Sequence, residues 1–80
     1  MNNQRVPVTT IEDLDTLMGE EIVEGYMDGL EDLPCGDNRS RSYWHGWRNG
    51  RMDGGHVTAD AAQQLLAFEV QRARWLKVLN

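Results

Sequence analysis

Two short motifs with the same spacing constrain the fold of this chain more than any other feature of its sequence. Gly25-Tyr26-x-x-Gly29 and Gly46-Trp47-x-x-Gly50 each place two glycines four residues apart, with an aromatic residue after the first. Glycine inside a helix costs about 1 kcal/mol relative to alanine, so two such pairs need a structural reason. Residues four apart share a helix face, and the spacing therefore predicts two helices whose backbones cross closely at the glycines. The alternative is coincidence in a chain with eight glycines.

The spacing of apolar residues predicts an all-α fold. Across residues 11–33 an apolar side chain recurs every three or four positions, which is the period of an amphipathic helix. Thr10 is expected to cap this helix, Gly19 is its weak point, and Pro34 ends it. The sequence shows no alternating apolar pattern long enough to predict a strand.

Two more helices are predicted after the turn that follows the first. One covers residues 40–53 and should lie antiparallel to the first, so that residues 10–53 form a helical hairpin. A C-terminal helix is predicted over residues 58–79, with Thr58 as its cap. The fold class is therefore a small three-helix domain built on a hairpin.

Length and composition favour one small domain. Residues 1–9 are expected to form a flexible arm, and residues 10–80 a single helical domain. Because 80 residues bury only about 60% of their unfolded surface, a large catalytic cleft between domains is excluded. The absence of an 18-residue apolar run or an apolar leader, together with the single Cys35, favours a cytoplasmic location.

Three motifs together resemble the ribosome modulation factor family: Gly25-Tyr26-x-x-Gly29, Pro34-Cys35 and Tyr43-x-x-Gly46-Trp47-Arg48. The resemblance covers about residues 20–51, less than half of the chain. It implies a helical hairpin that binds the ribosome or another RNA-containing machine. The family's loop reads Cys-Pro, its first aromatic is a tryptophan where this chain has Tyr43, and its ribosome-binding members are strongly basic.

Charge is unevenly distributed along this chain, whose net charge is −5. Residues 1–38 hold ten acidic residues and one arginine, whereas residues 39–52 hold four arginines and no acid. One interpretation is that the acidic and basic segments attract each other and otherwise face water. The other is that the basic segment binds phosphates or another anion.

Four residues of the predicted second helix are candidates for binding nucleic acid or a partner protein: Arg41, Trp44, Arg48 and Arg51. Trp44 is expected to be an exposed ring among arginines, a combination that stacks on unpaired bases and contacts phosphates. Tyr43 and Trp47 are expected to lie in the core instead. Because four arginines are few and acids surround them, a protein partner is at least as strongly indicated as RNA.

Catalysis, a cofactor and metal binding are not expected. Cys35, His45 and His56 lack the paired spacing of metal ligands, and an acidic loop around Cys35 disfavours its thiolate. The sequence also lacks a nucleophile elbow and a phosphate-binding glycine loop. It therefore predicts a protein that is not an enzyme.

The C-terminal helix carries two apolar stripes. The first should pack on the hairpin and comprises Ala62, Leu66, Val70, Ala73 and Leu76. The second comprises Phe68, Trp75 and Leu79 and lies more than about 100° away around the helix. Either the N-terminal arm covers this second stripe, or the protein associates through it, with a second copy as a homodimer or with another partner.

Two functions fit the sequence. The first is a small RNA-binding or ribosome-binding protein that uses the arginines and Trp44. The alternative is an acidic inhibitor or adaptor, with an origin in a phage or another mobile element, that docks on a basic protein surface. Arginines exposed around Trp44 would favour RNA, whereas arginines buried or paired with acids would favour a protein partner.

Overall fold

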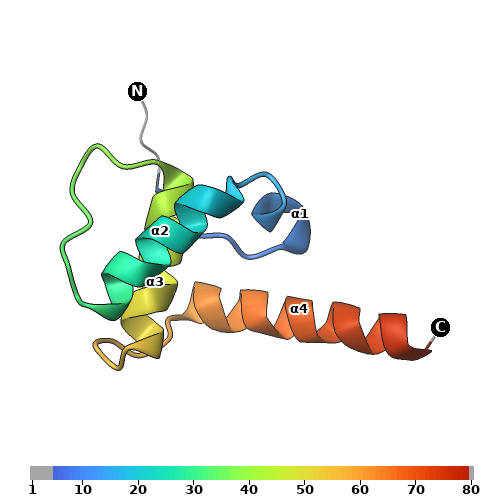
Figure 1. Ribbon diagram of the computed structural model, residues 1–80. Helices are drawn as coiled ribbons and strands as arrows, with labels where there is room; N and C mark the ends of the chain where they lie inside the picture. Colours follow the sequence, from blue (N-terminus) through green and yellow to red (C-terminus); the bar gives the residue numbers. More distant parts are fainter. Residues whose placement is uncertain (1–4, 80) are drawn as a thin grey trace.

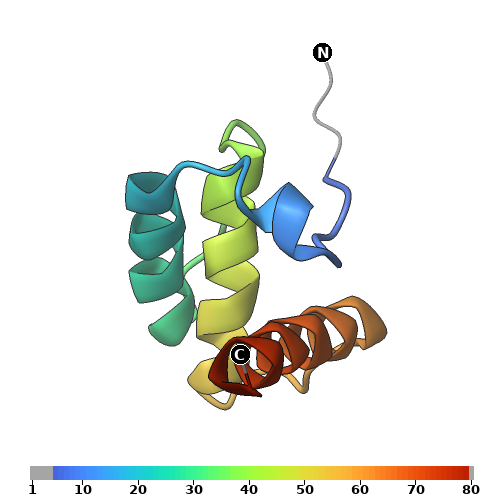
Figure 2. The same cartoon turned by 90° about the vertical axis from the view of Figure 1, so that its right-hand side faces the viewer.

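The computed structural model describes residues 5–79, which form four α-helices and no strand (Figure 1). The helices are α1 (Ile11–Leu14), α2 (Gly19–Leu30), α3 (Arg41–Asp53) and α4 (Ala61–Leu79). α3 is central: α2 packs along one side of it, and α1 and α4 lie on the other (Figure 2). The predicted all-α class is confirmed, and none of the described helices is long and apolar enough to cross a membrane.

The glycines bring α2 and α3 into backbone contact, as their spacing predicts. A Cβ atom on Gly25 would lie 2.9 Å from the Trp47 backbone nitrogen, and one on Gly29 would lie 2.9 Å from that of Arg51. From the other helix, a Cβ on Gly46 would lie 2.7 Å from the Ile22 carbonyl carbon. A Cβ atom on Gly50 would likewise overlap backbone atoms of Tyr26 and Leu30. Any side chain at these four positions would therefore push the helices apart.

The two helices run parallel, so the predicted antiparallel direction is wrong. Later residues of α2 contact later residues of α3: Ile22 lies against Gly46, and Leu30 lies against Gly50. The connection over residues 31–40 returns along the length of the pair (Figure 1). Ten extended residues reach about 33 Å, whereas the 12 residues of α2 rise only about 18 Å, so the loop is long enough for this return.

Side-chain anchors hold the returning loop against α3. The Trp47 indole Nε1–H donates a hydrogen bond to the Leu33 carbonyl at 2.7 Å, and Arg5 donates to the Gly36 carbonyl at 2.6 Å. Cys35, between them, is buried. These contacts join residues far apart in sequence, and they decide the direction that helix periodicity leaves open.

The first predicted helix, residues 11–33, is two helices in the structure. Thr10 caps α1 as predicted, accepting the Asp13 N–H at 3.1 Å. The chain then leaves helical geometry, and the Met18 N–H donates to the Ser42 hydroxyl of α3 at 2.8 Å. Gly19, the predicted weak point, becomes the first residue of α2. Because the register changes at this break, Met18 is exposed instead of continuing the apolar stripe.

α2 also ends earlier than residue 33. Asp32 adopts a positive φ of 57°, and its N–H donates to the Gly29 carbonyl at 2.9 Å. The Leu33 N–H donates to the Asp28 carbonyl at 3.0 Å. This pair of bonds is a Schellman ending, which satisfies the last carbonyl groups before Pro34 is reached.

The N-terminus of α4 corrects the prediction that Thr58 caps it. The Asp60 side chain accepts the Gln63 N–H at 2.9 Å, and the Gln63 side chain accepts the Asp60 N–H at 3.0 Å. This reciprocal pair is a capping box, and it starts the helix at Ala61. Thr58 lies outside the helix and is exposed.

The buried side chains gather around α3. Tyr43 is buried, as expected, and its hydroxyl donates to the Asp28 carboxylate of α2. Val8 is buried as well, and the Val6 carbonyl accepts a bond from Arg41, so residues 5–8 of the predicted arm contact the helices; residues 1–4 lie outside the described residues. On α4 only Leu66 is buried, and every residue from Gln71 to Leu79 is exposed.

Candidate functional site

Three arginine–aromatic stacks lie along α3; two lie within the helix, and the third uses Arg39, two residues before it. The guanidinium carbon of Arg39 lies 4.1 Å from the Tyr43 ring centre, that of Arg48 lies 4.8 Å from the Trp44 ring, and that of Arg51 lies 5.1 Å from the Trp47 ring. Each pair is four residues apart, the spacing that places side chains one above the other on a helix. Cation–π attraction therefore orders Arg48 and Arg51 along α3, and Arg39 just before the helix begins.

Each of these arginines also holds a carboxylate of the same chain. Arg39 pairs with Glu24 at 3.2 Å, Arg51 with Asp32 at 2.9 Å, and Arg48 with Asp60. The acids come from α2, from the residues after it and from the α4 cap. The ring on one side and the carboxylate on the other fix the guanidinium plane. These ion pairs agree with the first of the two interpretations of the charge pattern, in which the acidic and basic segments of the chain attract each other.

Arg41 makes the most complete ion pair. Its two terminal nitrogens donate to both oxygens of Asp13 at 2.9 and 2.6 Å. The hydrogen bonds from Arg41 hold the pKa of Asp13 below its usual value. A bidentate pair of this kind leaves one guanidinium nitrogen, Nε, which donates to the Val6 carbonyl at 2.8 Å. Arg41 is thus committed to tying α1 and residue 6 to α3.

The four predicted binding residues are only partly brought together. Trp44, Arg48 and Arg51 line a shallow hollow of about 260 Å³, whose walls also include Trp47. Arg41 lies seven residues before Arg48, about 10.5 Å along the helix, and does not line the hollow. Trp44 is half-buried instead of exposed, because Arg48 covers its ring. Trp47, assigned to the core from its sequence position, is also only half-buried.

The outward face of α2 is a surface that the sequence analysis missed. Val23 and Met27 are 61% and 55% exposed on it, and Glu20 and Glu31 flank them. Within residues 5–79, neither glutamate has a cation within salt-bridge distance. The sequence contained a signal for this surface. The four residues recur at steps of three and four, on the helix face opposite Gly25 and Gly29. This α2 outer face combines an apolar centre with an acidic edge.

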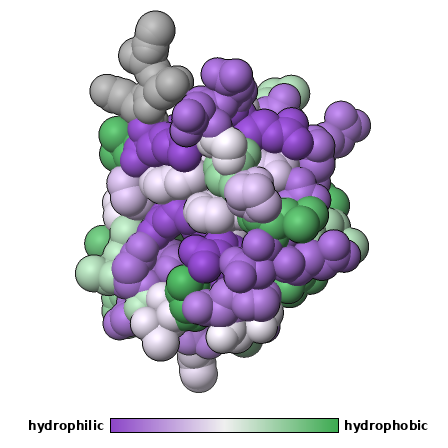
Figure 3. Space-filling model, turned by 90° about the vertical axis from the view of Figure 1, so that its left-hand side faces the viewer, coloured by the Kyte–Doolittle hydropathy of each residue, from purple (hydrophilic) through white to green (hydrophobic). Residues whose placement is uncertain are grey.

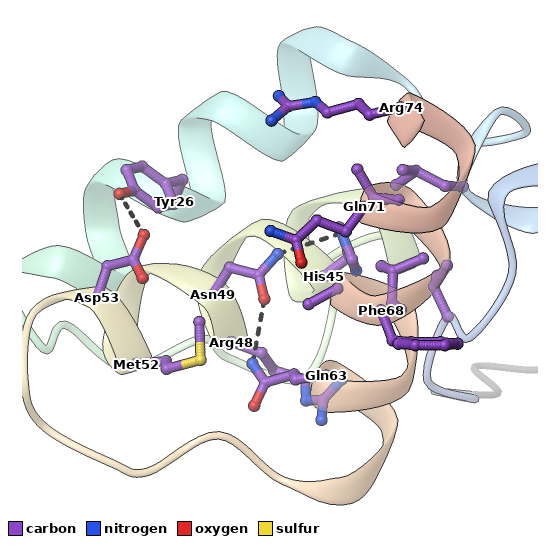
Figure 4. Close-up of a pocket in the computed structure, with 15 residues that line it drawn as sticks. Tyr26, His45, Arg48, Asn49, Met52, Asp53, Gln63, Phe68, Gln71 and Arg74 are labelled. Carbon is purple, nitrogen blue, oxygen red and sulfur yellow. Dashed lines mark hydrogen bonds between the residues drawn. The ribbon is translucent and has the colours of Figure 1, made fainter. Parts of the chain in front are cut away.

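A larger cleft of about 700 Å³ separates α4 from α2 and α3 (Figure 4). Its floor is polar: Asn49 contacts the His45 ring at 3.3 Å and accepts a bond from Gln63 at 3.1 Å, and Tyr26 donates to Asp53 at 2.7 Å. Burial lowers the pKa of His45, and the nearby arginines lower it further. These bonds join α3 to α2 and to the first turn of α4, so they serve the fold.

The residues weighed as metal ligands lie apart. Cys35 is buried, and burial raises the pKa of its thiol. His45 lies in the cleft, and the His56 ring contacts the Leu30 carbonyl at 2.9 Å. Among the described residues, no group of three or more histidine, cysteine or acidic side chains could hold a metal ion.

The second stripe of α4 stays in contact with water. Phe68, Trp75 and Leu79 are 62%, 65% and 70% exposed. Val8 of the N-terminal segment is buried and borders the same cleft as Phe68, but the described part of that segment still leaves all three side chains mostly exposed. Figure 3 shows a different face, which includes the connection between α2 and α3; it is mainly hydrophilic, with separate hydrophobic spots.

Comparisons with known proteins do not assign the chain to a family. No family model, no curated protein and no solved structure matches it.

Proposed function

We propose that this protein is a non-enzymatic binding protein whose α2 outer face docks on a basic protein surface with an apolar centre. One observation carries the proposal: all four arginines of residues 39–51 are paired with carboxylates of the chain, whereas Glu20 and Glu31 have no cation among the described residues. The charge left over for a partner is therefore negative. The net charge of −5 has the same sign.

The shape of the face suits docking as a helix in a groove. Glu20, Val23, Met27 and the C-cap residue Glu31 span 12 residues, or about 16 Å along the helix axis. Apolar side chains at such spacing bury into a groove, and flanking acids attract a basic rim and set the orientation. Methionine adapts to irregular apolar surfaces. α2 is free to do this because its inner face, not its outer one, holds it to α3 (Figure 2).

RNA or the ribosome is the second candidate partner, through Trp44, Arg48 and Arg51. The hollow that these residues line, and the resemblance to the ribosome modulation factor family, favour it. To bind there, phosphate groups would have to replace Asp60 and Asp32 on the arginines. Both carboxylates are about half exposed, so the exchange is sterically open, but the acidic chain repels the phosphates.

Site-specific photo-crosslinking in the native host distinguishes the two candidates. A photoreactive residue at position 27 should give a protein adduct of defined mass, which Glu20→Lys/Glu31→Lys abolishes. The matched control, Glu12→Lys/Asp37→Lys, changes the net charge equally at exposed sites elsewhere and should retain the adduct. A ribonuclease-sensitive adduct from position 44, without any protein adduct from position 27, would refute the proposal and support RNA binding.

A further inference from the structure

The outward face of α4 has the residue spacing of a coiled-coil seam. Its members recur at alternating steps of four and three residues: Ala61, Leu65, Phe68, Arg72, Trp75 and Leu79. These positions lie opposite Leu66, the residue that buries α4 against the rest of the chain. A strict alternation of three and four keeps side chains facing one partner helix over successive turns. α2 and α4 are separate helices that flank α3 in different places (Figure 2), so the seam and the α2 outer face are separate surfaces.

The uncovered area is large enough for a dimer. Five large apolar side chains on or beside the seam are 48% to 70% exposed: Leu65, Phe68, Trp75, Leu76 and Leu79. Because an aromatic side chain has about 150–250 Å² of surface and a leucine somewhat less, these five leave roughly 500–600 Å² of surface in water. If all of this surface were covered, two copies would bury up to about 1,200 Å², which reaches the lower end of stable, specific interfaces.

From this surface we propose that the protein forms a homodimer in which the α4 helices of two copies pack antiparallel through the seam. Arg72, the one charged residue of the seam, decides the orientation. In a parallel pair the two Arg72 side chains would meet at one level and repel each other. In an antiparallel pair, centred near residue 70, each Arg72 faces Phe68 of the partner subunit, and a guanidinium over an aromatic ring is favourable.

Charge and size match in the same register. Glu69 lies 3.7 Å from Arg72 within one chain, and in the antiparallel pair it also comes beside Arg72 of the partner subunit. The same register brings the two Glu69 carboxylates close to each other across the axis, and the Arg72 guanidinium groups of both subunits lie beside them and neutralise them. At the next levels Leu65 packs against the partner's Trp75, and Leu79 packs against the partner's Ala61, so the largest residues meet smaller ones.

The antiparallel register also places the exposed C-terminal half of α4 beside the anchored half of its partner. Residues 71–79 extend beyond the rest of the chain (Figure 1), whereas residues 62–70 include the half-buried positions next to α3. Dimerisation would therefore support the part of the helix that the monomer leaves in water. The proposal is independent of the proposed function, which uses α2.

Sedimentation equilibrium tests the association. The wild type should be dimeric at micromolar concentration, and Trp75→Ala should raise the dissociation constant at least about tenfold, since tryptophan dominates such interfaces. Met27→Ala, on the α2 outer face, removes an apolar side chain of comparable exposure and should leave the constant unchanged. A wild type that stays monomeric at high micromolar concentration would overturn the proposal. Circular dichroism of each variant checks that the helices persist.

Single-cysteine crosslinking with a short bismaleimide, in a Cys35→Ala background, tests the orientation. Gln71→Cys lies close to the symmetry axis and should crosslink between chains. Leu79→Cys should not, because antiparallel packing places the two copies of residue 79 about 27 Å apart. A crosslink at residue 79 without one at residue 71 would show a parallel dimer and contradict the inferred register.

Discussion

Gly46→Ala is the most direct test of the close contact between α2 and α3. The added Cβ atom would overlap the Ile22 carbonyl oxygen and lie 2.7 Å from the Ile22 carbonyl carbon. These are backbone atoms, so no rotamer change can relieve the overlap. Ordinary contact begins near 3.4 Å, and the helices would have to separate locally by at least about 0.7 Å.

The expected loss of stability can be worked from opposing effects. Overpacking typically costs about 1–3 kcal/mol, and an obstacle made of backbone favours the upper end. Alanine returns about 1 kcal/mol of helix propensity. The free energy of unfolding should therefore fall by about 2 kcal/mol, and the melting temperature by about 8–16 °C for a domain of this size. An 80-residue chain has only about 4–12 kcal/mol in total, so the effect is large.

Gly19→Ala is the matched control, because a Cβ atom there meets nothing within 4 Å. It should leave stability unchanged or raise it by up to about 1 kcal/mol. Both variants are compared with the wild type by urea and thermal unfolding at one protein concentration, since dimerisation would shift the midpoints. If the melting temperature of Gly46→Ala equals or exceeds that of the wild type, the inference that the glycines are needed for backbone contact is wrong.

Three further predictions concern single side chains. Asp60→Ala should cost about 1 kcal/mol of unfolding free energy by removing the capping box with Gln63, whereas Thr58→Ala should be neutral; urea unfolding measures both. Because burial holds the pKa of His45 below its ordinary value of 6.5, the unfolded chain binds that proton more readily. Unfolding free energy should therefore fall as the pH drops from about 7.5 to 5.5, and His45→Asn should flatten this slope. Cys35, which is buried and has a raised pKa, should react with a thiol reagent far more slowly in the native protein than in urea; equal rates would contradict its burial.

Local features of the sequence determined which segments are helical and where two of them touch. Glycine pairs four residues apart predict a close helix contact wherever helices form, because the cost of glycine and the helix period are local properties. The Thr10 cap is local in the same way, since its bond spans only three residues. The separation of acidic and basic segments likewise predicted their mutual attraction, although it could not name the partners.

Only the tertiary structure decided the direction of α3, the use of each arginine, and whether the chain breaks at the weak point that Gly19 marks in the sequence. Parallel and antiparallel pairs present the same glycine spacing, and the choice depends on Trp47 and Cys35 holding the returning loop. The break at Met18 depends on a hydrogen bond to Ser42, 24 residues away. Whether Arg48 meets a phosphate or Asp60 depends on where α4 begins. Each is a contact between distant segments, whose energy is not encoded in the periodicity of either segment alone.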